Sequence, residues 1–234
     1  MDNLKALTMK LRSLITGSVA LILLVSLSAQ AADSIKLYSR PGSKMKIHGT
    51  ANILHTEWDV ESPTIIGSLE ASPGFPTEQG QALTPGKVDA KADVIVMVRT
   101  LRSVEPDGKP YSDKMDDIMY EKLLATNAAA KITFHLNELT LKETAKDKDS
   151  PYLFEAKGDL GVAGVTNQIT MPVNVLPLGA KKLKISGATA VKMTDFKIDP
   201  PKVTLIHLIA GDEVKLSFDW MVGPRGSSAA AAAK

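Results

Sequence analysis

Apolar and polar residues alternate with a period of two along most of the chain, which is typical of strands with one buried face. The clearest run is 87–98, where Asp89, Lys91 and Asp93 oppose a row of small and branched apolar residues. The same alternation recurs in Lys131–Leu136, Tyr152–Val162, Ile169–Val175, Leu183–Val191 and Val214–Trp220. Weaker strands are predicted over Ile35–Tyr38, Met45–Leu54 and Thr64–Leu69.

One segment, Ser112 to Ala125, follows a helical period instead. Its apolar residues Met115, Ile118, Met119 and Leu123 share one face of a helix. Ser112 is placed to cap the N-terminus, and the acidic residues that follow it suit the positive end of the helix dipole. In Val94–Val98 the outward residues Ile95 and Met97 are apolar as well. We therefore expect the helix to cover that outer face.

The pattern as a whole predicts an all-β fold of eight or nine antiparallel strands with one covering helix. It offers no helical crossovers, which excludes an alternating βαβ architecture. We expect the sheet to close into a barrel or to pack as a sandwich, and closure would remove exposed strand edges. A barrel of about eight strands is either filled by its own side chains or holds one small ligand.

The first residues have the pattern of a secretory signal peptide. A basic stretch at 9–12 precedes a mostly apolar core at 14–27, and Ala29-Gln30-Ala31 has the small-x-small pattern of a cleavage site. The apolar core is short for a membrane span. We predict a signal peptide at 1–31, a barrel domain at 32–222, a disordered tail at 223–234, and a periplasmic or secreted location.

Charge and cysteine content exclude several classes of function. Removal of residues 1–31 leaves 25 basic and 25 acidic residues, so the sequence carries no basic footprint for nucleic acid. The chain has no cysteine, which excludes disulfides, thiolate nucleophiles and cysteine-ligated metals. No nucleophile elbow, phosphate-binding loop or H-E-x-x-H motif occurs. The sequence predicts no cofactor.

The stretch KIHGTANILHTEWDV, residues 46–60, holds two histidines near acidic residues. One reading is a metal-dependent enzyme built on His55 and Glu57. However, the alternation puts His48 and His55 on opposite faces, and a zinc site needs at least three protein ligands. The favoured reading is structural: Trp58 closes one barrel end, with its indole N–H bonded to one partner.

Two later stretches, DLGVAGVTNQITMPVNV (159–175) and ISGATAVKMTDFKID (185–199), resemble the YceI-like family in order and spacing. The family pattern G-x-L-x-x-x-G-V-T-x-x-x-x-x-P is matched here, and so is its later D-F-x-I. The segment GTANILHTEW resembles the N-terminal motif of one branch of the family. The matching residues are Gly158, Leu160, Gly164, Val165, Thr166 and Pro172, then Asp195, Phe196 and Ile198, with Asp117, Ile132 and Phe134 in an earlier motif.

The resemblance implies a lipocalin-like barrel with a tunnel for a long apolar molecule of the polyisoprenoid class, and thus a non-enzymatic carrier. We expect the inner strand faces to bind this ligand through burial of apolar surface. The candidate ligand-binding residues are Val94, Val96, Val98, Ile132, Phe134, Leu136, Phe154, Leu160, Ile169, Met171 and Ile185.

An alternative is a barrel filled by its own side chains, serving as a stress-response or protein-interaction module. Small inner residues such as Gly158 and Gly187 favour a hollow interior, whereas Phe134, Phe154 and Phe218 could fill it. The Pro- and Gly-rich loop from Glu70 to Gly86 is interpreted as a passive surface loop rather than a lid. The oligomeric state stays open, with a homodimer as one option.

Overall fold

In a computed structural model, the described residues are 34–52, 56–124, 130–203 and 207–225. Contacts within the chain separate Met1–Ala31 from Ala32–Lys234, and all described residues belong to the second unit. The predicted signal peptide and residues 226–234 of the tail lie outside the described residues.

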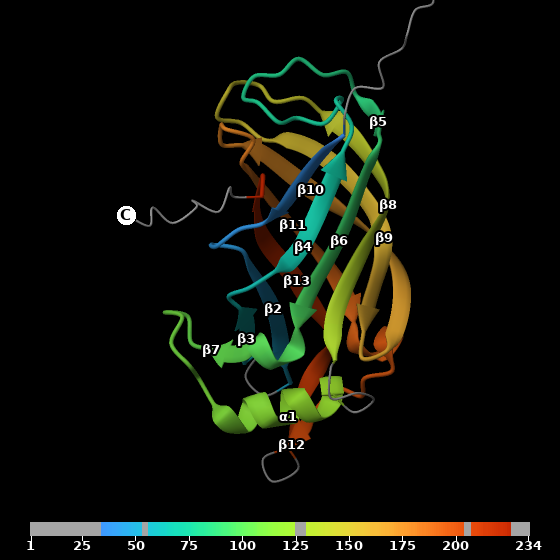
Figure 1. Ribbon diagram of the computed structural model, residues 1–234. Coiled ribbons are helices and arrows are strands. Elements are labelled where there is room, and N and C mark those ends of the chain that lie inside the picture. The colour runs from blue at the N-terminus through green and yellow to red at the C-terminus, as the bar shows by residue number, and fades with distance from the viewer. Residues whose placement is uncertain (1–33, 53–55, 125–129, 204–206, 226–234) are drawn as a thin grey trace, which may run out of the picture. The chain divides into compact units, whose positions relative to one another are not determined.

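Eight antiparallel strands form a closed barrel (Figure 1). Their order around the ring is β1-β4-β6-β8-β9-β10-β11-β13, and pairing of β1 with β13 closes it. The strands are β1 (Ile35–Ser39), β4 (Ile66–Ala71), β6 (Ala90–Met97), β8 (Lys131–Glu143), β9 (Tyr152–Val162), β10 (Val165–Pro177), β11 (Leu183–Lys192) and β13 (Leu208–Gly223). The predicted all-β antiparallel barrel is confirmed.

Further strands extend the sheet beyond the ring. Strand β13 pairs with β1 only near its C-terminal end, and β2 (Lys44–Ala51) occupies the rest of the same edge. From β2 the sheet continues through β3 (Glu57–Ser62) to β7 (Arg102–Val104). Two short strands, β5 (Gly86–Val88) and β12 (Lys202–Val203), pair with β8 and β13. Strands β3, β7 and β12 were not among the predicted elements, and the single strand predicted over 87–98 is divided into β5 and β6.

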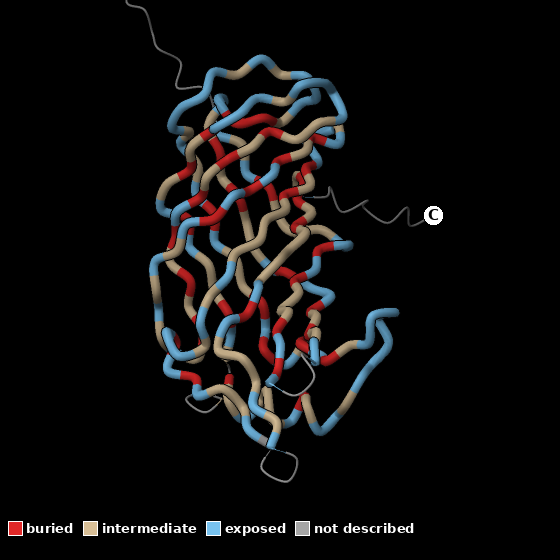
Figure 2. Tube along the Cα trace, turned by 180° about the vertical axis from the view of Figure 1, so that it is seen from behind, coloured by how far each residue is buried: buried red, intermediate tan, exposed pale blue. Residues whose placement is uncertain are grey.

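The alternation in the sequence corresponds to the inside and outside of the barrel. Along β9 every second residue, from Tyr152 to Val162, is buried, and Figure 2 shows buried and exposed positions alternating along the strands. In β8 a bulge between Leu136 and Glu138 moves the buried row from even to odd positions. The single-period prediction for this strand therefore stopped at Leu136, seven residues before its end.

One end of the barrel is packed solid. Its most deeply buried side chains include Tyr152, Leu141, Leu183 and Val222. The strand register brings these positions to the same end, since Leu183 faces Val222 and Leu141 faces Phe154. At this end the fold is held by a conventional core, and the hollow part of the barrel lies beyond it.

Helix α1 (Asp113–Leu124) lies across the opposite end of the barrel (Figure 1). Ser112 caps it as predicted, because Met115 N donates a hydrogen bond to Ser112 Oγ at 3.3 Å. The prediction that it covers the outer face of Val94–Val98 was wrong: Met97 remains 37% exposed. The helix instead packs on β7 and on a 3₁₀ turn, η1 (Val98–Thr100), and its apolar face turns toward the barrel opening.

In the described ranges, no helix is long and apolar enough to cross a membrane.

Candidate functional site

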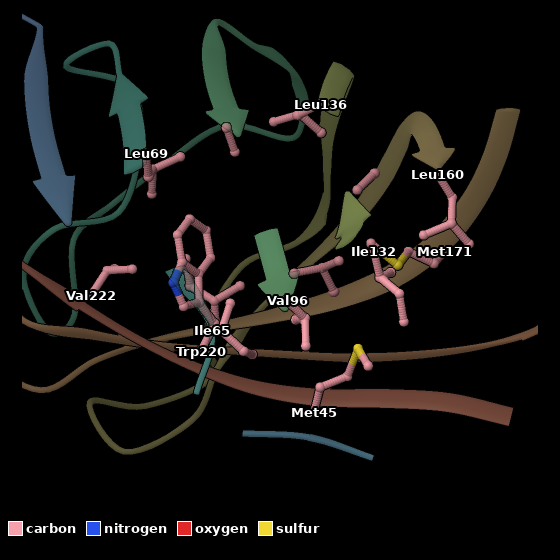
Figure 3. Close-up of a cluster of buried hydrophobic side chains, with 14 of the residues drawn as sticks. Met45, Ile65, Leu69, Val96, Ile132, Leu136, Leu160, Met171, Trp220 and Val222 are labelled. Atoms are coloured by element: carbon pink, nitrogen blue, oxygen red, sulfur yellow. The ribbon is translucent and has the colours of Figure 1, made fainter. Parts of the chain in front are cut away.

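A narrow, almost entirely apolar cavity of about 120 Å³ lies inside the barrel. Strands from all around the ring contribute to its wall, including Met45, Leu69, Met171 and Trp220. Figure 3 shows several of these side chains turned toward one another from different strands. The only polar residues in the wall are Thr133, Thr189 and Ser217. Such a cavity disfavours charged groups and favours a ligand whose apolar surface is removed from water on binding.

Most of the candidate ligand-binding residues line this cavity. They are Val94, Val96, Ile132, Phe134, Leu136, Leu160, Ile169, Met171 and Ile185. Two others are buried but do not line it. Val98 belongs to the 3₁₀ turn η1 because β6 ends at Met97, and Phe154 lies behind Phe75 at the packed end.

The loop between β4 and β5 closes the packed end of the cavity. Its Phe75 is 2% exposed, lines the cavity and stacks on Phe154 with ring centroids 5.7 Å apart. Gln81 holds the loop in shape, since its side chain bonds Thr77 N and Phe75 O while its carbonyl accepts the Tyr152 hydroxyl at 2.6 Å. The passive-loop reading missed this inserted aromatic, because a single Phe carries no periodic signal.

A second, wider cavity of about 490 Å³ lies under helix α1. Ile132 and Leu216 line both cavities, so the two adjoin. The helix wall of the wide cavity includes Met115, Ile118, Met119 and Leu123, with Lys114 and Lys122 beside them. Unlike the narrow cavity, the wide one also has the acidic residues Glu57, Asp59 and Glu105 in its wall.

Five methionines line the two cavities. Met45 and Met171 line the narrow cavity, and Met115, Met119 and Met193 line the wide one. A thioether side chain is flexible and polarisable, so it adapts to irregular apolar shapes.

An ion-paired cluster lies at the edge of the wide cavity, on β2 and β3. Asp59 accepts Lys46 Nζ at 2.7 Å and pairs with His48 Nδ1 at 2.9 Å. Burial by itself raises the pKa of Asp59, but the hydrogen bonds and charges of Lys46 and His48 outweigh it. The pKa of this carboxyl therefore lies below its ordinary value. This cluster fixes β2 to β3.

Trp58 packs against β2 on the opposite face of the β2–β3 pair. Its ring occupies the space over Gly49, where an added Cβ would lie 2.1 Å from Trp58 Cζ2. The indole N–H donates to Thr50 O at 3.2 Å, and the side chain lines the wide cavity. The indole N–H thus has one partner, as expected, while closure of a barrel end by Trp58 stays a prediction, because β3 lies beyond the eight-stranded ring.

His55, the centre of the metal-enzyme reading, lies outside the described residues. His48 and Asp59 lie opposite each other on one face because β3 runs antiparallel to β2. Counting parity along one continuous strand does not predict this pairing. Within residues 34–52, 56–124, 130–203 and 207–225, no three His, Cys, Asp or Glu side chains converge as a metal site requires.

Two solved structures share this fold at low sequence identity. A polyisoprenoid-binding domain from Saccharophagus degradans, described as implicated in plant cell wall breakdown, aligns with a TM-score of 0.57 and 12% identity, over 82% of this chain and 100% of its own. BcnA of Burkholderia cenocepacia aligns with a TM-score of 0.53 and 16% identity, over 76% of this chain and 95% of its own. A comparison with curated proteins gave no significant match.

The family model for the YceI-like domain matches residues 42–222. This range runs from the turn before β2 to the end of β13 and includes both cavities. It covers well over half of the chain and agrees with the resemblance seen in the sequence motifs. The chain belongs to the YceI-like domain family.

Proposed function

We propose that this protein is a non-enzymatic carrier that holds one apolar, lipid-like molecule of the polyisoprenoid class inside its barrel. The observation that carries the proposal is the narrow cavity, whose wall is apolar except for two threonines and one serine. Burial of apolar ligand surface there contributes about 25 cal/mol per Å² before the entropy costs of binding.

The arrangement of the two cavities supports one orientation of the ligand. The narrow cavity ends against Phe75, which is buried and whose carbonyl accepts a hydrogen bond from the Gln81 side chain. The wide cavity under α1 has polar residues in its wall, including Lys114 and Lys122. An apolar chain therefore lies in the narrow cavity, and the more polar end of the molecule lies under the helix.

The ligand of a structural neighbour supports this class of molecule. The Saccharophagus degradans domain with this fold is described as polyisoprenoid binding. A polyisoprenoid is a long chain without charge along its length, and it matches a cavity wall of aliphatic, aromatic and thioether side chains.

Extraction of the purified protein tests this function. Organic solvent should release one apolar lipid per protein, and native mass spectrometry should show the corresponding added mass. A protein that is empty on purification and takes up no fluorescent isoprenoid analogue would contradict the proposal.

We further propose that residues 1–31 are removed during secretion and that the carrier works in the periplasm or outside the cell. The support is the basic, apolar and small-residue order of residues 9–31. The full chain, expressed in a bacterial host, should appear in the periplasmic or external fraction with the mass of 32–234. Recovery of uncleaved protein in the cytosol or the membrane would overturn this assignment.

A further inference from the structure

Two phenylalanines occupy opposite walls of the narrow cavity. Phe134 is on β8 and Phe218 is on β13, and three strands separate β8 from β13 in either direction around the ring. Both rings line the cavity. Because they lie on opposite strands of the ring and both line the cavity, the two rings limit the width available to a ligand from opposite walls.

Each ring lies against a glycine of the neighbouring strand. A Cβ added to Gly158 on β9 would lie 2.4 Å from Phe134 Cζ, and one added to Gly187 on β11 would lie 3.0 Å from Phe218 Cε1 and Cζ. A side chain at Gly158 would collide with the Phe134 ring, and one at Gly187 would press on the Phe218 ring and collide with Pro172 O, which lies 2.8 Å from the added Cβ. The missing side chains let both rings lie close to the wall rather than extend into the cavity.

Burial separates these rings from the other core phenylalanines. Phe75, Phe154 and Phe196 are 2%, 2% and 3% exposed. Phe134 and Phe218 are only half-buried, although their strands form the barrel wall. Protein atoms cover the glycine side of each ring, and the uncovered side borders the cavity. A packing residue of a closed core would be covered on both sides.

We propose that Phe134 and Phe218, seated on Gly158 and Gly187, are the residues that determine ligand width in the narrow cavity. The inference rests on the proposed carrier function. With both rings in place the cavity admits a slim apolar chain, and it excludes a rigid fused-ring molecule such as a sterol. Removal of either ring adds width on that side and relaxes this selectivity.

The experiment compares two fluorescent probes, the slim chain cis-parinaric acid and the rigid sterol dehydroergosterol, on the full protein freed of bound lipid. We expect wild type to bind the chain. Phe134→Ala and Phe218→Ala should each shift the ratio of the two affinities toward the sterol by about tenfold, the scale of a change in apolar pocket shape. The leucine variant at the same position replaces any alanine variant that fails to fold.

Leu183→Ala is the control. Leu183 is more deeply buried than the two phenylalanines, but it lies at the packed end and lines neither cavity. Its replacement should lower the melting temperature and leave the affinity ratio unchanged. Equal ratios in all three variants and wild type would overturn the assignment of width to Phe134 and Phe218 while leaving the carrier function intact. A wild type that binds neither probe would contradict the carrier function itself.

Discussion

At the scale of residues, the proposed function depends on the positions where the barrel interior is not filled by side chains. The narrow cavity exists because glycines face Phe134 and Phe218, and because Phe75 fills one end but does not reach the rest. Motif reasoning placed most of the lining correctly, since a residue's face follows from its parity along a strand. Phe154 does not line the cavity. Its parity along the strand predicts that it points inward, but parity does not predict how far along the barrel axis it lies.

Asp59 makes a pH-dependent contribution to stability. Its pKa is lowered in the folded protein by Lys46 and His48, against the opposing effect of burial. A lowered pKa gives stability that is present above the ordinary pKa of an aspartate, about 3.9, and is lost as the pH falls through the folded value. We therefore expect Asp59→Asn to lower the free energy of unfolding at pH 7 and to have a smaller effect at pH 3.

Urea unfolding of wild type and Asp59→Asn at the two pH values measures this difference. Asp149→Asn is the control, because Asp149 is exposed in the loop between β8 and β9, away from the β2–β3 pair. An Asp59→Asn effect that is equal at both pH values would contradict the proposed role of the ion pair.

At the scale of elements, the sequence predicted strands well where one side of the strand faces the interior. Strand β9 was predicted with its true bounds, and α1 was predicted within one residue at each end. Strand β3 was missed because EWDVES alternates weakly. The position of α1 was also missed. An amphipathic pattern shows that one face of a helix is buried, but it does not show which part of the protein that face packs against.

Asp116 anchors α1 to the barrel. Asp116 is 7% exposed, and its carboxylate accepts a hydrogen bond from the backbone N–H of Ser103 at 2.6 Å. Ser103 Oγ in turn donates a hydrogen bond to Ser112 O. Removing the acceptor leaves a buried N–H without a partner, at a cost of about 1–3 kcal/mol. Asp116→Ala should therefore destabilise the protein by this amount and loosen the cover of the wide cavity.

Hydrogen exchange of the amides in Asp113–Leu124, with and without bound lipid, reports the loosening. Asp117→Ala is the matched control, because it removes the same charge from the next helix position, where the side chain is exposed. We expect faster exchange and faster lipid release only in Asp116→Ala. Similar behaviour of the two variants would show that helix charge, rather than the bond to Ser103, holds α1 in place.

At the scale of the whole molecule, the barrel is packed at one end and hollow toward the other. Sequence patterning gave the closed all-β fold, because a chain of two-faced strands without crossover helices has few other solutions. It left open whether the interior is full or hollow. The answer depends on how the rings of Phe75, Phe134 and Phe218 lie within the barrel. Alternation along a strand tells which face a residue is on, but it does not tell how far its ring extends into the interior.

The central claim is that an apolar chain occupies the narrow cavity, and Trp220 reports on it directly. The protein has two tryptophans; Trp220 lines the narrow cavity and Trp58 lines the wide one. In a Trp58→Phe variant all tryptophan fluorescence comes from Trp220. Titration with a chain-brominated isoprenoid alcohol should quench it, since bromine quenches only at close range. We predict saturable quenching at one ligand per protein, and none with the unbrominated alcohol. Binding of the brominated alcohol without loss of Trp220 fluorescence would contradict the account.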